Sequence, residues 1–365
     1  MPVEISPPPQ CSTWSLIIAT LNRAVELKTA ITFALTQTRS PKEIIIVDAS
    51  SNWLDTRAEI ATLFDLRTDI SLVYLRAAER SSAAQRNQGI LAASSDIVFL
   101  FDDDSFMYPE CAAEIMRIYD ADKKRTLAGV QAVLAALPPP GSLPFDDAID
   151  RKATGGQTGF SKRILDTAFF RWVWRELFLM DSERLFIPYT PPFPTAEVSA
   201  ELRHLDINPA RLLHGCRMTF RREIVLTEPF EALFLSYCPG EDLDCSYRAS
   251  RHGALVTSER AQLYHYESAN SRIDRYKVSL LQALNQAFCI RRHANDLERS
   301  RSSYYALMRR RLLAEFLKDG LSRRFAFPQF RGLAAAFRRS AQIFKMTDDE
   351  LTRSYPEMQR QILQQ

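Results

Sequence analysis

The first hundred residues alternate between short apolar runs and longer segments in which apolar side chains recur at helical spacing. The apolar runs predict four buried strands, "WSLIIAT", "KEIIIVDAS", "ISLVYLR" and "DIVFLFDDD". The segments with helical spacing predict helices in "LNRAVELKTAITFALTQT", "TRAEIATLFDL", "SSAAQRNQGILAAS" and "PECAAEIMRIYDA". Continuous apolar strands separated by helices indicate an α/β fold with a mostly parallel sheet and helices on both faces.

The pattern becomes weaker from Gly129 to His214, where proline-rich segments flank a tryptophan-containing helix, "DTAFFRWVWRELFLM". We interpret this region as an insertion or a substrate-facing subdomain. The segment "GCRMTFRREI" then predicts another strand, "GEDLDCSYRASRHGA" a helix with Gly253 as its C-cap, and "LVTSERAQLYHYES" a closing strand. After Asp274 the chain is mostly helical and rich in arginine.

These patterns divide the chain into three parts. We expect a proline-rich leader over residues 1–13, a main α/β domain over residues 14–274 with an insertion at about 130–213, and a basic helical region over residues 275–365. The leader lacks the charged and apolar regions of a signal peptide, and no stretch approaches the ~20 apolar residues of a membrane span. The six cysteines are scattered without C-x-x-C spacing, so we expect reduced thiols and a cytoplasmic location.

The formal net charge of +3 over 365 residues does not indicate a polyanionic partner, and we expect no nucleic-acid binding. Positive charge is concentrated between residues 291 and 345, where 14 Lys and Arg stand against 4 Asp and Glu. Four apolar residues in this region have helical spacing: Leu333, Phe337, Ala341 and Phe344. Two interpretations stay open. The region could lie peripherally on the inner face of an anionic membrane, or it could be a helical annex packed on the main domain.

Carboxylates directly follow two of the predicted strands. Asp48 ends the second strand, and Asp102, Asp103 and Asp104 end the fourth. In a parallel sheet the carboxyl ends of the strands meet at one edge, where ligands bind. Two carboxylates separated by one residue, as in Asp102-x-Asp104, can together reach a hard divalent cation. The alternatives are that this pair caps the next helix and that Asp48 caps its own turn.

Further candidates lie after the insertion. Glu241 and Asp242 stand at the start of a predicted helix, where the helix dipole favours an ionised carboxylate that could accept a proton from a hydroxyl group. The dipole favours acids there even without a catalytic role, and the sequence alone does not separate the two explanations. His265, at the end of the closing strand, could complete a metal site if the fold brings it to Asp104, and is otherwise a structural histidine.

Two arginines are candidate phosphate contacts. Arg86 lies in "QRNQG" and Arg23 in "TLNR". Guanidinium groups suit diphosphates because their N–H groups form a planar fork. The alternative for both side chains is a solvated helix face.

The order and spacing of these segments resemble family 2 glycosyltransferases with the GT-A fold. "ATLNR" is similar to that family's P-T-x-N-R, with alanine in place of proline, and "QTRSPKEIIIVDASS" to Q-T-x-x-x-x-E-I-I-V-V-D-D-x-S, with Ala49 in place of a second aspartate. "AAQRNQGI" is similar to A-x-x-R-N-x-G, and "VFLFDDDS" to a strand that ends in D-x-D. "HGCRMTFRRE" is similar to G-x-x-x-x-F-R-R, and "GEDLDCSYRASRHG" to E-D-x-D-x-x-x-R-x-x-x-x-G. The resemblance runs from Ser15 to Ser268 and leaves out Val130–Leu213 and the residues after Asp274.

The resemblance implies an inverting, metal-dependent hexosyltransferase of polysaccharide biosynthesis. It would take a sugar from a nucleoside-diphosphate sugar, with UDP as the expected nucleotide, and pass it to a glycan or lipid-linked acceptor that faces the insertion. Mn²⁺ or Mg²⁺ would bridge the diphosphate. Asp104 and His265 would bind this metal, and Asp242 would be the catalytic base. The residues that would bind the nucleotide sugar are Thr20, Arg23, Asp48, Arg86, Asp102, Asp103 and Glu241.

Two other classes of protein stay open. Haloacid-dehalogenase phosphatases also place D-x-D after an apolar strand, but normally on the first strand, whereas Asp102 follows at least three predicted strands. The second alternative is a non-catalytic protein that keeps the fold and binds nucleotide sugars without turnover.

Overall fold

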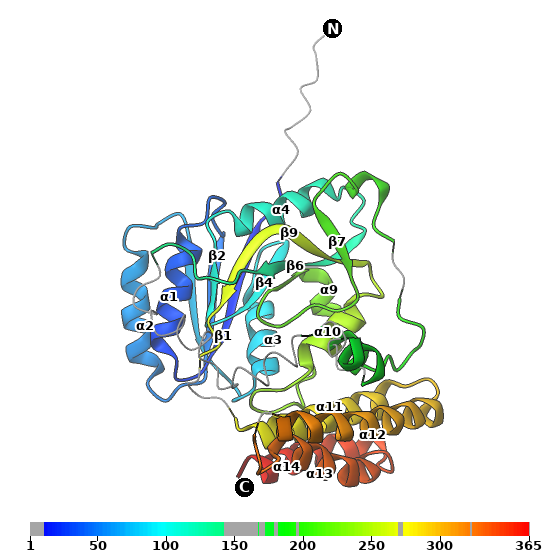
Figure 1. Cartoon of the computed structure of the whole chain (residues 1–365). Coiled ribbons are helices and arrows are strands. Elements are labelled where there is room, and N and C mark those ends of the chain that lie inside the picture. Colours follow the sequence, from blue (N-terminus) through cyan, green and yellow to red (C-terminus); the bar gives the residue numbers. More distant parts are fainter. Residues whose placement is uncertain are drawn as a thin grey trace.

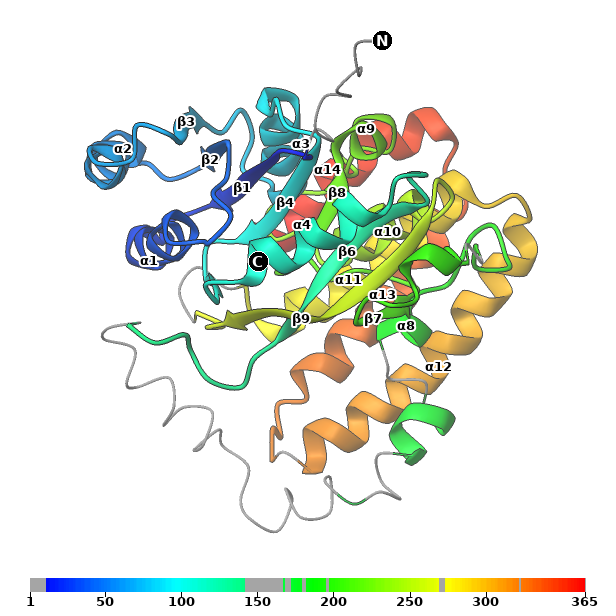
Figure 2. The same cartoon turned by 90° about the horizontal axis from the view of Figure 1, so that it is seen from above.

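A single sheet organises the part of the chain that the structure describes. The computed structural model describes residues 11–141, 167, 172–178, 182–194, 197–268, 273–321 and 323–364. Within these residues, nine strands form one sheet in the order β3-β2-β1-β4-β8-β6-β9-β5, and β7 pairs with β9 (Figures 1 and 2). The strands are β1 Trp14–Thr20, β2 Glu43–Asp48, β3 Ser71–Arg76, β4 Ile97–Asp102, β5 Ser105–Met107, β6 Leu127–Leu134, β7 Ile207–Ala210, β8 Met218–Arg221 and β9 Ala254–His265.

Helices connect these strands and form the C-terminal part of the chain. The first part contains α1 Ala24–Leu35, α2 Trp53–Ala61, the 3₁₀ turn η1 Thr62–Phe64, α3 Ser82–Ala92 and α4 Cys111–Ala121. The middle part contains the π-helical turn η2 Val173–Leu177, α8 Ser182–Leu185, the 3₁₀ turn η3 Ala200–Leu202, α9 Arg222–Thr227 and α10 Glu241–Ala249. The C-terminal part contains α11 Arg275–His293, α12 Leu297–Leu321, α13 Pro328–Ile343 and α14 Asp348–Gln364.

The sheet is parallel in its first half and mixed beyond β4. β1 pairs in parallel with β2 and β4, and β2 with β3, which confirms the strands predicted in the first hundred residues. β8 is antiparallel to β4 and β6, and both β5 and β7 are antiparallel to β9. The α/β fold class is confirmed, with a mixed sheet in which β6 is also parallel to β9. The sequence pattern does not predict β5, because three residues are too few to show a period.

The register of the parallel strands brings their polar ends to one edge. Thr20 pairs with Asp48 across β1 and β2, and Ala19 pairs with Asp102 across β1 and β4. The residues that follow these positions therefore lie close to one another, at the edge where ligands bind in parallel sheets.

The short strand β5 adds a histidine to this edge. Its first residue, Ser105, pairs with His265 at the end of β9. Because Asp104 directly precedes Ser105, this pairing sets Asp104 beside a side chain that is 161 residues away in the chain.

Strand side chains alternate between two hydrophobic layers. Within β2, Ile45 and Val47 belong to one cluster of buried side chains, and Ile44 and Ile46 belong to the other. Helices α3, α9 and α10 share the first cluster, and α1 and α4 share the second. The central strands are thus buried on both faces, which explains their uninterrupted apolar runs.

Helices α11 to α14 pack on the first of these layers, below the sheet in Figure 1. The apolar stripe of α13 takes part in this packing. Leu333 and Phe344 are buried, and the ring centroid of Phe337 lies 5.2 Å from that of Tyr305, while Ala341 is exposed. Most of the stripe therefore contacts protein, as the annex alternative requires, and is not available to a membrane. Within the described residues, no helix is long and apolar enough to cross a bilayer.

The helix α10 ends earlier than the sequence pattern predicts. Its last residue is Ala249 and its C-cap is Ser250, so the expectation that Gly253 caps it is wrong. A Cβ atom at Gly253 would lie 2.6 Å from the carbonyl oxygen of Thr126. This glycine is needed for the close approach of two backbones and not for a helix end.

Part of the expected insertion belongs to the sheet, since β7 and most of β6 fall within residues 130–213. The structure describes a part of the predicted tryptophan-containing helix, namely η2 and the exposed Trp172 before it. Most of the remaining residues of this predicted helix lie outside the described part of the chain. The division of the chain into leader, main domain, insertion and basic region stays a prediction.

A buried ion pair ties the end of α4 to β8. Arg221 Nη2 lies 2.8 Å from Asp122 Oδ2, and both side chains are almost fully buried. Burial raises the pKa of the Asp122 carboxyl, but hydrogen bonds from the backbone of Leu127 and Thr126 and from Arg221 outweigh burial and lower it. A pKa lowered in the folded state means that this carboxylate stabilises the fold above about pH 4, and that the contribution is lost as the pH falls further.

Asp122→Asn is expected to lower the free energy of unfolding by about 3–5 kcal/mol, because it leaves the Arg221 guanidinium buried without its counter-charge. Urea denaturation measures this loss. The matched control is Glu223→Gln, which breaks an exposed pair with Arg125 and is expected to cost less than about 1 kcal/mol. Similar losses in the two variants would mean that the buried pair does not stabilise the fold.

Candidate active site

The polar strand ends open into a cavity of about 320 Å³. Its walls come from the loop after β1, the first turn of α3, the end of β4, the loops before β8 and α10, and the end of β9. Eight of the ten residues proposed from the sequence line it: Thr20, Arg23, Arg86, Asp102, Asp103, Glu241, Asp242 and His265. Asp104 is buried beside it, and Asp48 lines two neighbouring hollows.

Two carboxylates and one imidazole meet at this cavity. One ligand atom from each of Asp102, Asp104 and His265 lies within 4.8 Å of the others. Asp104 Oδ1 is 3.1 Å from His265 Nε2, and Asp104 Oδ2 accepts a hydrogen bond from Ser268 N at 2.9 Å. Carboxylate oxygens suit Mg²⁺ and Mn²⁺, and imidazole suits transition metals. These side chains fit a divalent cation, and they include Asp102, which the sequence-based assignment gives to the nucleotide.

Cationic side chains compensate the crowded aspartates within the protein. Burial disfavours the charged imidazole of His265, but hydrogen bonds with Asp104 and Cys216 outweigh burial and raise its pKa to about 11. Burial raises the pKa of Asp103 to about 7, with Arg23 opposing the effect and the Asp104 carboxylate adding to it. His265 thus lies beside Asp104, Arg23 beside Asp103 and Asp104, and Arg86 beside Asp102.

Asp103 ties the end of β4 to the loop after β1. Its Oδ2 accepts a hydrogen bond from Thr20 Oγ1 at 2.7 Å, and its Oδ1 accepts one from Arg23 Nη1 at 2.9 Å. The same guanidinium nitrogen lies 3.5 Å from Asp104 Oδ2. Thr20 and Arg23 thus hold the three-aspartate turn in position, which is a structural role that the sequence does not reveal.

Arg86 lies between two carboxylates. Its Nη2 donates to Asp102 Oδ1 at 2.7 Å, and its Nη1 forms an ion pair with Glu241 Oε1. Glu241 Oε2 also accepts a hydrogen bond from Ser82 Oγ at 3.2 Å. Arg86 belongs to α3, Asp102 ends β4, and Glu241 is the first residue of α10. Arg86 therefore links these three elements, and its ion pair with Glu241 is buried.

Asp48 lies outside the main cavity but close to it. Its Oδ1 accepts a hydrogen bond from Ser50 N at 2.7 Å, which is the turn-capping contact considered from the sequence. Its Oδ2 accepts one from the Tyr74 hydroxyl at 2.6 Å, which no local pattern predicts. Asp48 and Ser50 line two hollows of about 270 Å³ each, one of which shares Thr20 and Arg23 with the main cavity. An elongated ligand could therefore extend from the main cavity to Asp48.

Asp242 lines the cavity from the first turn of α10. Its Oδ2 accepts a hydrogen bond from Gly215 N, and its Oδ1 accepts one from Leu243 N, both at 2.9 Å. Two backbone N–H groups thus fix a carboxylate that retains lone pairs for a proton. Gly215 is a site residue that the sequence-based assignment missed, although it is the glycine of "HGCRMTFRRE". A Cβ atom there would lie 3.3 Å from Arg86 Nη2 and 3.5 Å from Asp242 Oδ2.

The loop Leu233–Gly240 leads into α10 and has an unusual backbone. Ser236, Cys238 and Gly240 have φ angles of 63°, 47° and 89°, and all three line the main cavity. Positive φ costs free energy in residues other than glycine. The surroundings must therefore hold this loop in place.

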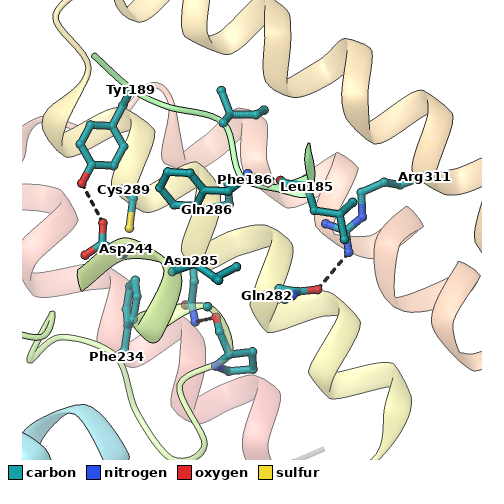
Figure 3. A pocket seen from close by; sticks show the side chains of 14 residues that line it. Leu185, Phe186, Tyr189, Phe234, Asp244, Gln282, Asn285, Gln286, Cys289 and Arg311 are labelled. Atoms are coloured by element: carbon teal, nitrogen blue, oxygen red, sulfur yellow. Dashed lines mark hydrogen bonds between the residues drawn. The ribbon is translucent and has the colours of Figure 1, made fainter. Parts of the chain in front are cut away.

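Two buried amide side chains of the C-terminal helices hold the loop. Gln359 Nε2 donates to the carbonyl oxygen of Leu233 at 2.8 Å, and Gln359 Oε1 accepts from Leu235 N at 2.9 Å. Asn285 Nδ2 donates to the carbonyl oxygen of Pro239 at 3.0 Å (Figure 3). The C-terminal helices thus help to fix the position from which α10 begins.

A second, small cavity of about 30 Å³ adjoins the same loop (Figure 3). It shares Pro239 and Gly240 with the main cavity, and Asn285 and Arg311 also line it. A volume of this size has room for one or two water molecules and not for a sugar ring. The main cavity is therefore the better candidate for a ligand site.

Tyr355→Phe is expected to loosen the loop. The Tyr355 hydroxyl donates to Asn285 Oδ1 at 2.5 Å and so orients the amide that holds Pro239. Losing a hydrogen bond to a buried group costs about 1–3 kcal/mol, so amide hydrogen exchange in residues 235–240 should become about tenfold faster or more. The matched control is Tyr304→Phe, because the equally buried Tyr304 hydroxyl donates to the carbonyl oxygen of Ala283. Equal exchange in both variants would show that the Asn285 amide does not hold the loop.

Comparison with known proteins finds one matching family model and similar solved structures. Residues 15–136 match the family model described as glycosyl transferase family 2. Comparison with curated proteins finds no match. A solved structure that matches is the mannosyltransferase PcManGT from Pyrobaculum calidifontis in complex with GDP-Man and Mn²⁺. The match covers 93% of this chain and 90% of that chain, with a TM-score of 0.50 and 14% sequence identity. At this identity the likeness shows the shared GT-A fold alone.

Proposed function

With residues 15–136 identified as a glycosyl transferase family 2 segment, we propose that this protein transfers a sugar from a nucleoside-diphosphate sugar to a hydroxyl group of an acceptor. The observation that carries the proposal is the meeting of Asp102, Asp104 and His265, with ligand atoms within 4.8 Å of one another, at the cavity that Asp242 also lines. A cation site beside a carboxylate base is the arrangement that transfer from a diphosphate leaving group needs.

The donor would lie along the edge of the sheet. Its diphosphate would occupy the main cavity beside the metal ligands, and its nucleoside would extend towards Asp48, whose carboxylate can accept hydrogen bonds from a base or ribose. UDP is the nucleotide expected from the sequence. GDP is a second candidate, because PcManGT was solved in complex with GDP-Man. The residues assigned to the donor are Thr20, Arg23, Asp48, Arg86, Asp102, Asp103 and Glu241.

Asp104, His265 and Asp102 would hold Mn²⁺ or Mg²⁺. When bound, this cation stabilises the negative charge that develops on the departing nucleoside diphosphate. Arg23 lies 3.5 Å from Asp104, and Arg86 lies 2.7 Å from Asp102. Both guanidinium groups add fixed positive charge beside the diphosphate and hold the two carboxylates in position.

Asp242 would act as the general base. The N–H groups of Gly215 and Leu243 orient its carboxylate, which accepts the proton of the acceptor hydroxyl. The hydroxyl oxygen attacks the anomeric carbon from the face opposite the diphosphate, a new glycosidic bond forms, and the bond to the nucleoside diphosphate breaks. A single displacement of this kind inverts the anomeric configuration.

The test is donor cleavage in a panel of UDP-sugars and GDP-mannose, with Mn²⁺ and a range of glycan and lipid-linked acceptors. Chromatography measures the released nucleoside diphosphate, and NMR assigns the anomer of the product. We expect one donor to give nucleoside diphosphate together with a product of inverted configuration. A product of retained configuration would contradict the single displacement.

Two outcomes would support the alternatives. Donor binding without release across the acceptor panel would indicate a non-catalytic nucleotide-sugar-binding protein. Release of phosphate from simple phosphomonoesters would indicate a haloacid-dehalogenase-like phosphatase, although Asp102 ends the fourth strand along the chain and not the first.

A further inference from the structure

Exposed apolar side chains of the C-terminal region gather on one face of α12. Leu313, Phe316, Leu317 and Leu321 recur at spacings of three and four residues, which places them on one side of the helix. Phe325 follows in the next loop, and the five side chains are 54, 46, 39, 37 and 74% exposed. We call these five residues the α12 patch. Figure 2 shows α12 along the outer side of the C-terminal helices.

Positive charge flanks the α12 patch along the chain. The exposed arginines in and beside this part of the chain are Arg309, Arg310, Arg323 and Arg331. The segment from Arg309 to Arg331 contains two carboxylates, Glu315 and Asp319, and both are buried. In the part of this segment that the structure describes, the exposed surface therefore carries cations and no carboxylate.

Specific contacts hold the two carboxylates inside the protein. Asp319 Oδ2 accepts hydrogen bonds from Gln329 N at 3.0 Å and Phe330 N at 3.2 Å, at the start of α13. Glu315 lies 3.5 Å from Lys318 Nζ with its own side chain buried. Turning Asp319 outward would break its hydrogen bonds to the start of α13, so the fold keeps this carboxylate away from the exposed surface of the α12 patch.

We propose that the α12 patch docks on the surface of an anionic lipid bilayer. Its leucine and phenylalanine side chains enter the boundary between headgroups and acyl chains, while the arginines beside it pair with lipid phosphates. A second copy of the chain fits this surface less well, because a symmetric contact through the same patch brings the arginines of both copies together. The inference goes beyond the proposed reaction and does not depend on it. It also moves the membrane contact from the stripe of α13, which is packed, to α12.

The test is co-sedimentation of the full-length protein with vesicles, without any nucleotide sugar. One set of vesicles contains phosphatidylcholine alone, and the other contains phosphatidylcholine mixed with phosphatidylglycerol. We expect the wild type to sediment with the anionic vesicles at low salt, to be released at high salt, and not to bind the neutral vesicles.

Substitutions separate the two contributions. Arg309→Gln with Arg310→Gln should lower the partition coefficient about 25-fold, since each arginine near an anionic surface contributes about fivefold. Phe316→Ser with Phe325→Ser should lower it about tenfold or more, because two apolar side chains no longer enter the bilayer.

The matched control is Leu66→Ser with Leu91→Ser, which changes two leucines that are highly exposed but lie outside the α12 patch. This variant should bind anionic vesicles like the wild type, and thermal unfolding confirms that each variant is folded. Absence of wild-type binding to anionic vesicles at low salt overturns the proposal, as does equal binding by the patch and control variants. A halved solution mass of Phe316→Ser with Phe325→Ser would assign the α12 patch to a second copy and overturn it too.

Discussion

Asp242→Asn is expected to lower the rate of sugar transfer by about 10²- to 10⁴-fold, which is the contribution typical of a general base. The amide has the size of the carboxylate but cannot take the proton of the acceptor hydroxyl. Its single oxygen can also accept from only one of the two backbone N–H groups that orient Asp242, those of Gly215 and Leu243. We therefore expect an accompanying loss of stability of about 1 kcal/mol.

Two measurements on Asp242→Asn separate catalysis from binding. The transfer rate should fall in kcat, while calorimetry should show unchanged binding of the nucleoside diphosphate with Mn²⁺. The matched control is Glu357→Gln, which makes the same carboxyl-to-amide change in an exposed ion pair with Arg360 and should leave both quantities unchanged. Transfer by Asp242→Asn at nearly the wild-type rate would mean that another group accepts the proton.

Asp104→Asn is expected to lower the Mn²⁺-dependent affinity for a nucleoside diphosphate by about 100-fold or more. The substitution removes one charged ligand from the group formed with Asp102 and His265, and changes to the partners of metal ligands alone already cost about 10- to 100-fold. Asp104 is buried, so no mobile surface side chain can take its place. Calorimetric titration of UDP and GDP in the presence of Mn²⁺ measures the loss.

Asp103→Asn is the matched control for this substitution. Asp103 neighbours Asp104 but lies outside the group of metal ligands. Both of its oxygens accept hydrogen bonds, one from Thr20 and one from Arg23, and an amide keeps one of these contacts. Because Asp103 is also among the residues assigned to the donor, we expect Asp103→Asn to weaken nucleotide binding less than Asp104→Asn does and to retain its dependence on Mn²⁺. Equal losses in Asp103→Asn and Asp104→Asn would mean that the turn as a whole matters and that Asp104 has no special role as a ligand.

Local sequence patterns were sufficient to locate one edge of the site. The apolar runs that end at Asp48 and Asp102 predict two buried strands, and pairing each of them with β1 in parallel necessarily brings these carboxylates to the same edge. The start of α10 is likewise marked by Gly240 and the acids that follow it. These features depend on the chain within a few residues, which is the range over which hydrophobic period and turn residues carry information.

Contacts between distant segments could not be predicted in this way. Arg86 and Glu241 each have ordinary neighbours in the sequence, and nothing local indicates that they form a buried ion pair. The same holds for Asn285, whose amide reaches the carbonyl oxygen of Pro239. The spacing of apolar residues along a helix also does not reveal which other segment of the protein, if any, packs against its apolar face.

The two helices of the basic region illustrate this limit. Leu333 of α13 and Phe316 of α12 both belong to apolar stripes, yet Leu333 is buried and Phe316 is 46% exposed. The difference comes from which face of each helix packs on the rest of the protein, and that depends on the whole fold.

The cavity is proposed to bind a nucleoside-diphosphate sugar through a divalent cation. Thermal unfolding of the wild type with each nucleotide sugar tests this proposal most directly. Each scan is made with Mn²⁺ and again with a chelator. We expect at least one UDP- or GDP-sugar to raise the Tm with Mn²⁺, and the increase to disappear with the chelator and in Asp104→Asn. If no nucleoside-diphosphate sugar stabilises the protein in a metal-dependent way, the assignment of this cavity is wrong.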